Sequence, residues 1–297
     1  MTMLREVADK GSFTAAARKL EVPVSTLSRK VSELEVVLGT TLLTRTTRKI
    51  TLTDAGFNYL AAARRILEDI DEAERRARGE FIAPKGELVL TAPIHFGRLH
   101  VLPIVREFLS LYPEISIRLV LTDRNVDLLE DRVDMAVRIG ELGDSSLIGT
   151  KIGAMRTVVT ASPVLLASRG VPQSPEDLLN YPCITIDLPM PSTGWRFKPA
   201  GSRRVIDVPV LPRLAITTTE AAVLAAVDGV GIARTLCYQV ADPIAADKLK
   251  LILRDFEPEL APIHLIHGAR GAMPMKMRTF LDFATPRFRN GLRDLDA

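Results

Sequence analysis

A short stretch near the N-terminus concentrates side chains that can hydrogen-bond to nucleic acid. Its hydroxyls and cations are Ser25, Thr26, Ser28, Arg29 and Lys30. Guanidinium and ammonium groups donate to phosphate oxygens and to guanine edges, and hydroxyls reach both kinds of group. These residue types at this spacing predict contact with double-stranded DNA. Thr14, on the preceding segment, joins the candidate set.

A basic tip follows between two β-prone runs in residues 42–52. The tip carries Arg45, Arg48 and Lys49, which would contact the DNA backbone or the minor groove. Such contacts position a protein without specifying sequence. The alternative, for any single residue here, is a solvated basic hairpin that touches no DNA.

Two short helices are predicted to position the first group of side chains. Ser12 is a good N-cap for one helix, Pro23 suits the first turn of the other, and Gly39 ends it. The apolar positions at helical spacing are Phe13, Ala16, Ala17 and Leu20, and then Leu27, Val31, Leu34 and Leu38. The hydroxyls and cations lie off this apolar face, near the N-terminus of the second helix, where a recognition helix enters the major groove.

The distribution of charge agrees with this placement. The chain has a net charge of +3, yet residues 1–50 alone carry nine Lys and Arg against five Asp and Glu. The remaining residues therefore carry a net charge of −1. The basic excess lies wholly in the N-terminal segment, where binding of a polyanion is expected.

Length and composition restrict the class of protein. A chain of 297 residues, 47% hydrophobic, is long enough for two or three folded units. We expect a cytoplasmic protein without membrane contact, because the N-terminus lacks a cationic and apolar leader and no apolar run approaches the ~20 residues of a membrane helix. Cys183 and Cys237 lack metal-ligand spacing, so no metal site is expected and buried thiols are favoured over redox sensing.

The N-terminal pattern resembles that of the LysR-type transcriptional regulators. The matching motifs are Gly-Ser-Phe-Thr-Ala-Ala-Ala at 11–17, Leu-Ser-Arg at 27–29, Leu-Glu at 34–35, Leu-Gly at 38–39, and Leu-Thr-x-Ala-Gly at 52–56. Pro23 and Val24 stand where many members carry Ser-Gln, so no glutamine contact is assigned to Val24. The chain begins later than family members usually do, so its first helix is expected to be short.

A long helix is predicted from Thr53, a capping residue, to Arg78. Its apolar positions alternate spacings of four and three, as in a coiled-coil seam: Tyr59, Ala63, Ile66, Ile70, Ala73 and Ala77. The seam could pack against its own domain. The resemblance instead implies a dimer through this helix, an imperfect inverted repeat as the DNA target, a dimer of dimers, and RNA polymerase as a further candidate partner.

The fold class expected is an N-terminal all-α winged helix-turn-helix (1–53), a linker helix and hinge (54–87), and a C-terminal α/β effector-binding domain (88–297). In that last part, strand-like runs alternate with helical ones, which indicates α/β units with a parallel core sheet. A short helix is expected near Val126–Glu130. The resemblance implies a two-lobed, periplasmic-binding-protein-like domain, with lobe I at about 88–160 and 266–297 and lobe II at about 161–265.

Two segments are candidates for a ligand site between the lobes, because helix N-termini and strand ends present free N–H groups to anions. One follows the first strand and the other opens a helix, and three residues after the second and third strands border the same opening. The candidates are Pro93, Ile94, His95, Phe96, Asp123, Arg138, Gly140, Thr217, Thr218 and Thr219.

Each candidate has a plainer interpretation that stays open. Thr218 or Thr219 could simply cap its helix, Arg138 could pair with Asp134, and His95 could be a surface loop residue. We expect no resident cofactor, but a small-molecule effector, an organic acid by preference, with its charge near Thr217–Glu220.

Two other functions are less well supported. A solute receptor of the transport class would explain the C-terminal part alone, but it would need an export signal in place of the DNA-binding head. An enzyme would need a convergent catalytic set, and the sequence offers no such set of catalytic residues.

Overall fold

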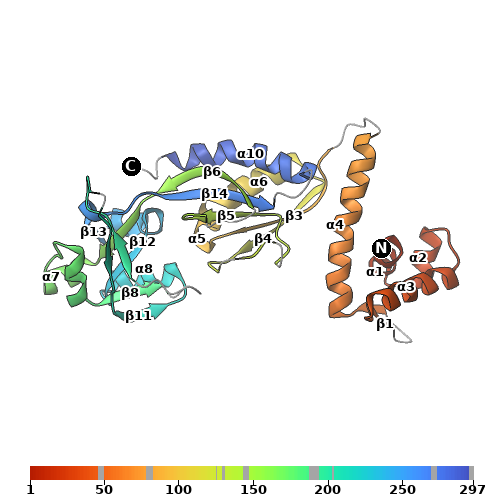
Figure 1. The fold of residues 1–297 in the computed structure, drawn as a ribbon, viewed down its shortest axis with the longest axis horizontal. Helices are drawn as coiled ribbons and strands as arrows, with labels where there is room; N and C mark the ends of the chain where they lie inside the picture. Colours follow the sequence, from red (N-terminus) through yellow and green to blue (C-terminus); the bar gives the residue numbers. More distant parts are fainter. Residues whose placement is uncertain are drawn as a thin grey trace. The chain divides into compact units, whose positions relative to one another are not determined.

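The computed structural model describes residues 1–45, 50–77, 83–124, 126–128, 131–142, 147–186, 194–202, 204–268 and 273–293. The chain divides into two compact units, residues 1–83 and 84–297, each with its own core (Figure 1). The boundary between the units falls inside residues 54–87, the segment expected to form the linker helix and hinge. No helix among the described residues is long and apolar enough to span a membrane.

The first unit is helical with one short hairpin. Its elements are α1 (Thr2–Lys10), α2 (Phe13–Lys19), α3 (Val24–Leu38), β1 (Leu43–Arg45), β2 (Ile50–Leu52) and α4 (Asp54–Ala77). The predicted cap is present, because the Ser12 side chain accepts the Ala15 amide at 3.3 Å. Ala16 and Leu27 are buried between the helices, so the apolar stripes face one another as the pattern indicates.

The turn from α3 into the hairpin is fixed by polar groups. Oε1 of Glu35 accepts the amides of Leu42 (2.8 Å) and Leu43 (3.0 Å), two donors that no helix or strand would satisfy. Thr53 Oγ1 donates to the Thr41 carbonyl at 2.7 Å and accepts the Gly56 amide at 2.9 Å, which caps α4. The start of α4 is thereby held against the start of β1.

Helix α4 divides its apolar face between two environments. Ala63 is buried within its own unit, and Tyr59 packs against the same core. Ile66 and Ile70, further along, are 44% and 49% exposed. The first part of the seam therefore packs internally, whereas Ile66 and Ile70 are exposed to solvent in the single chain.

Lobe I of the second unit is built on a five-stranded sheet of order β4-β3-β5-β14-β6. Its strands are β3 (Gly86–Ala92), β4 (Ile115–Leu121), β5 (Met135–Ile139), β6 (Leu147–Met155) and β14 (Ala261–Gly268). The expected parallel sheet is only partly right. β3 pairs parallel with β4 and β5, but β14 runs antiparallel to β5 and β6, because it returns from the other lobe.

One long helical segment and the last helix cover lobe I (Figure 1). The helical segment consists of α5 (Ile94–Phe96), a π-helical turn (Gly97–Val101) and α6 (Leu102–Leu111), and the last helix is α10 (Met275–Gly291). Phe108 of α6 and Phe280 of α10 meet edge to face at 5.1 Å in the core. A Cβ on Gly97 would lie 2.2 Å from a Leu121 methyl group, so the π turn approaches β4 closely.

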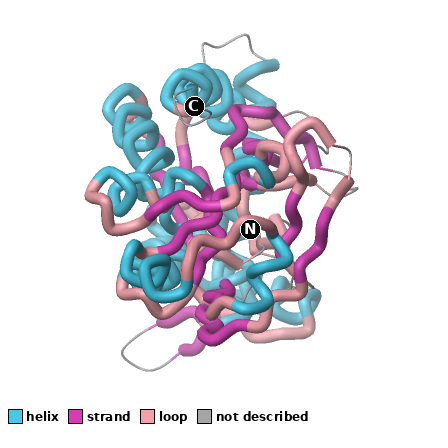
Figure 2. The backbone as a smooth tube through the Cα atoms, turned by 90° about the vertical axis from the view of Figure 1, so that its left-hand side faces the viewer, coloured by secondary structure: helices cyan, strands magenta, loops and turns pink. Residues whose placement is uncertain are grey.

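Lobe II has a second five-stranded sheet of order β11-β8-β12-β7-β13, with helices beside its strands (Figure 2). Its strands are β7 (Thr157–Ala161), β8 (Cys183–Ile186), β11 (Pro212–Ile216), β12 (Ile232–Leu236) and β13 (Lys250–Ile252). A separate hairpin pairs β9 (Trp195–Phe197) with β10 (Ile206–Val208). The helices are α7 (Pro163–Arg169), α8 (Thr219–Val227), α9 (Ala241–Ala245) and short 3-10 turns at Pro175–Asn180, Cys237–Gln239 and Arg254–Phe256.

The chain crosses between the lobes twice, a few residues earlier each time than the sequence suggests. β7 pairs with β12 and β13 of lobe II, so the first crossing is at Arg156. β14 belongs to lobe I, so the second crossing lies between Phe256 and Ala261. Arg156 and Glu257 join the two crossings through two hydrogen bonds of 2.8 Å.

The predicted short helix near Val126–Glu130 is not found in the described part of that segment. Leu128, Asp131 and Arg132 lie in turns, and two backbone hydrogen bonds join this segment, from Asp131 N to Asp127 O (2.9 Å) and from Val133 N to Leu128 O (2.9 Å). Residues 129 and 130 of the predicted helix lie outside the described residues.

Replacing Gly56 with alanine should destabilise the first unit, although alanine is the better helix former by ~1 kcal/mol. The added Cβ would lie 1.9 Å from the Leu42 carbonyl oxygen, so α4 and the hairpin must separate. We expect a loss of roughly 1–3 kcal/mol in the free energy of unfolding, measured by urea denaturation followed by circular dichroism.

Gly291→Ala is the matched control, because nothing lies within 4 Å of the added methyl group in α10. It should leave the midpoint unchanged or raise it. A Gly56→Ala protein as stable as the parent would show that the contact between Leu42 and Gly56 is not tight.

Candidate functional site

The polar face of α3 carries the side chains predicted to contact DNA. Ser25, Arg29 and Lys30 are exposed, and Thr26 and Ser28 are half-buried. All five lie off the buried side of the helix that holds Leu27 and Val31. Thr14, on α2, is also exposed.

An acidic residue that the sequence analysis did not single out pairs with two of these cations. Glu33 accepts from Arg29 Nη1 at 2.7 Å and from Lys30 Nζ at 2.9 Å, at spacings of four and three residues on α3. The hydrogen bond from Lys30 holds the pKa of Glu33 below its ordinary value. Because all three side chains are half exposed, the pairing is weak and the cations can exchange to phosphate.

The hairpin after α3 has the form predicted for the wing. β1 and β2 pair antiparallel, with Leu43 opposite Leu52 and Arg45 opposite Ile50. Arg45 therefore ends the first strand. Arg48 and Lys49 lie outside the described residues.

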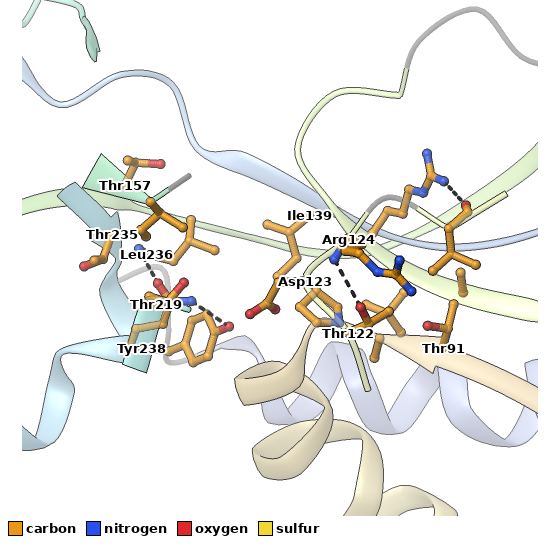
Figure 3. A pocket seen from close by; sticks show the side chains of 18 of the residues that line it. Thr91, Thr122, Asp123, Arg124, Ile139, Thr157, Thr219, Thr235, Leu236 and Tyr238 are labelled. Atoms are coloured by element: carbon orange, nitrogen blue, oxygen red, sulfur yellow. Dashed lines mark hydrogen bonds between the residues drawn. The ribbon is translucent and has the colours of Figure 1, made fainter. Parts of the chain in front are cut away.

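A cavity of about 320 Å³ lies between the two lobes of the second unit (Figure 3). Strand ends and the loops after them supply its walls. The described lining residues of lobe I are Thr91, Ala92, Pro93, Thr122, Asp123, Arg124, Val126, Ala136, Val137, Arg138 and Ile139; those of lobe II are Thr157, Ile186, Thr219, Arg234, Thr235, Leu236, Tyr238 and Gln239.

Four of the ten predicted ligand residues are among this lining: Pro93, Asp123, Arg138 and Thr219. Arg138 donates to the Val126 carbonyl, which holds the loop after β4 against β5. Asp123 Oδ1 accepts the Ile94 amide at 3.0 Å and so caps the long helical segment of lobe I.

The other six predicted residues lie outside the lining. Phe96 is fully buried in the lobe I core, and His95 packs edge to face on Tyr238 with ring centroids 5.4 Å apart. Thr218 is the N-cap residue of α8, but its side chain makes no capping hydrogen bond. Ile94, Gly140 and Thr217 are also absent from the cavity wall.

Tyr238 is a residue that the sequence analysis missed. It comes from lobe II, yet its ring is buried against Phe96 (5.9 Å) and His100 (5.7 Å) of lobe I. Burial raises the pKa of Tyr238, so its hydroxyl stays neutral, and burial lowers the pKa values of His95 and His100. The ring therefore ties the lobes together by apolar contact beside the cavity.

The cavity lining is positively charged overall. The described lining residues include three arginines, Arg124, Arg138 and Arg234, and a single carboxylate, that of Asp123. Burial lowers the pKa of Arg234, although a guanidinium remains protonated at neutral pH. Among the described residues, no group of three or more His, Cys, Asp or Glu side chains could hold a metal ion.

Comparison with known families covers both units. The family described as "LysR substrate binding domain" matches residues 83–289, and the family described as "Bacterial regulatory helix-turn-helix protein, lysR family" matches residues 1–57. The N-terminal resemblance and the two-lobed C-terminal fold are therefore confirmed.

Individual relatives agree over the whole length. The HTH-type transcriptional regulator CrgA of Neisseria meningitidis is 32% identical over 294 residues, which are 98% of this chain and 97% of that protein. The solved structure of CrgA has a TM-score of 0.60 at 30% identity, covering 97% of both chains. The full-length structure of AphB, the Vibrio cholerae virulence activator, has a TM-score of 0.59 at 26% identity, covering 95% of this chain and 96% of that one. The chain belongs to the LysR family of helix-turn-helix transcriptional regulators.

Proposed function

We propose that this regulator binds an imperfect inverted repeat in double-stranded DNA through α3 and the hairpin, under the control of a small organic acid bound between the lobes. The observation that carries the proposal is the cavity with three arginines against one aspartate, in the same chain as a helix with an exposed hydroxyl and cationic face. A cation-lined cavity between lobes favours a small anion.

The proposal includes an assembly. The exposed Ile66 and Ile70 on α4 offer an apolar surface to the same helix of a second copy, which would place two α3 helices for two half-sites. A dimer of dimers would extend this arrangement. Because the output is transcription, RNA polymerase in the cytoplasm is the candidate partner of the DNA-bound assembly.

Replacing Arg29 with alanine should weaken binding to the operator more than binding to unrelated DNA. A well-placed base contact contributes ~1–3 kcal/mol of discrimination, so the ratio of the two affinities should fall about tenfold. Mobility shifts with genomic fragments identify the operator and then measure both affinities. Arg48→Ala, in the basic segment between β1 and β2 in the sequence, should instead lower both affinities together and flatten their salt dependence.

An unchanged affinity ratio in Arg29→Ala would show that this side chain contacts no base. If the parent protein forms no site-specific complex with any genomic fragment, the proposed DNA target itself is wrong.

Replacing Ile70 with glutamate should abolish dimerisation and with it high-affinity binding to the repeat. The change puts a charge into each half of a symmetric apolar contact, and burying an unpaired charge costs several kcal/mol. Sedimentation velocity measures the oligomeric state, and circular dichroism checks the fold. Ile70→Leu is the matched control and should stay associated. An intact oligomer in Ile70→Glu would place the interface elsewhere.

Small carboxylic acids should raise the melting temperature of the full-length protein in a thermal-shift screen. Binding to the folded state alone contributes ~2.7 kcal/mol at a hundredfold excess over Kd. Thr219→Val should reduce the shift, because Thr219 lines the cavity at the start of α8. Thr218→Val is the neighbouring control outside the lining. If both variants lose the same part of the ligand-induced shift in melting temperature, the Thr219 hydroxyl does not contact the ligand.

A further inference from the structure

The carboxylate of Asp123 stands at the centre of the cavity. Figure 3 shows it projecting from lobe I into the space before Tyr238 and Leu236 of lobe II. Oδ1 accepts the Ile94 amide at 3.0 Å, and no cation among the described residues forms an ion pair with the carboxylate. The Ile94 amide therefore fixes the position of the Asp123 carboxylate, and the negative charge of that carboxylate can still pair with a cationic group of a ligand.

The neighbour across the cavity does not neutralise that charge. Tyr238 receives a hydrogen bond from Gln239 Nε2 at 3.2 Å, and its hydroxyl stays protonated because the ring is buried. A phenol and a carboxylate together form a polar patch that accepts a protonated amine well. Hydroxyls of Thr122, Thr157 and Thr219 elsewhere in the wall add donors and acceptors around it.

A ligand that is only an anion is poorly matched to this arrangement. Its carboxylate would gain from Arg124 and Arg138, but Asp123 shares the same small cavity and would repel it. A positively charged group on the same ligand would be attracted to the Asp123 carboxylate and would offset that repulsion. Because the cavity wall carries both cationic and anionic side chains, it favours a ligand that carries both an anionic and a cationic group.

We propose that the cavity binds an amino acid or a similar amino-carboxylate, with Asp123 as the residue that selects the protonated amine and the arginines holding the acid group. The inference rests on the proposed function, because it names the chemical class of the effector. A volume of about 320 Å³ suits a small metabolite of this kind.

Matched pairs of compounds test the proposal directly. Isothermal titration of the full-length protein with succinate and aspartate, and with glutarate and glutamate, compares the same acid skeleton with and without an ammonium group. The aminated member of the pair that fits should bind at least tenfold more tightly.

The variant Asp123→Asn isolates the charge. The asparagine oxygen can still accept the Ile94 amide, so the helix cap is kept while the negative charge is lost. The preference for the aminated compound should disappear, and the plain dicarboxylate should bind more tightly than it binds the parent. Glu220→Gln removes an equal charge outside the lining, where Glu220 pairs with Arg98 at 3.5 Å, and should keep the preference.

Three outcomes contradict the inference in different ways. Plain acids that bind as tightly as their aminated partners would overturn the role of Asp123 and leave the organic-acid effector intact. An aminated preference that survives in Asp123→Asn would assign the selection to another residue. If the parent protein binds no member of either pair or of the wider acid screen, the effector class fails as well.

Discussion

The cavity between the lobes exists because the chain passes between two sheets twice, at Arg156 and again between Phe256 and Ala261. The paired, two-point contact of Arg156 with Glu257 joins these passages with both side chains largely buried, and such planar pairs fix direction as well as distance. The strand ends of both lobes are thereby aimed at one space. The lining residues, scattered from position 91 to 239 in the sequence, become neighbours only through this arrangement.

Local patterns in the sequence predicted the elements better than they predicted their partners. The strands Ile115–Leu121 and Met135–Ile139 begin and end where the apolar runs do. The direction of β14 and the lobe to which β7 belongs depend on hydrogen bonds with distant strands, which no local pattern encodes. The same limit applies to the cavity. Asp123 and Thr219 stand at element ends and could be found, whereas Tyr238 and Arg234 look like ordinary residues of a short turn and a buried strand until the lobes are brought together.

In the DNA-binding unit, by contrast, the contacts that fix the turn join residues that are close together in the sequence. Glu35, Thr53 and Gly56 hold the hairpin and α4 together through contacts with residues 41–43, so a span of about twenty residues defines the geometry of the turn. Glu33 lies one turn away from Arg29 on the exposed face. Because its ion pairs are solvated, they keep the cations ordered at little cost in free energy and release them readily to a stronger anion such as a phosphate.

The π-helical turn at Gly97–Val101 makes lobe I sensitive to the deletion of a single residue. A wider turn accommodates one residue more than an α-helical turn, and one residue corresponds to about 100° of rotation about the helix axis. Ahead of the turn, His95 and Phe96 face Tyr238, and behind it Ile104 and Phe108 face the sheet core. The π turn therefore sets the rotation of the segment before it relative to the helix after it, so that His95 faces Tyr238 while Ile104 and Phe108 face the sheet core. Loss of a single residue there would leave both halves helical and yet turn one of them away from its partner.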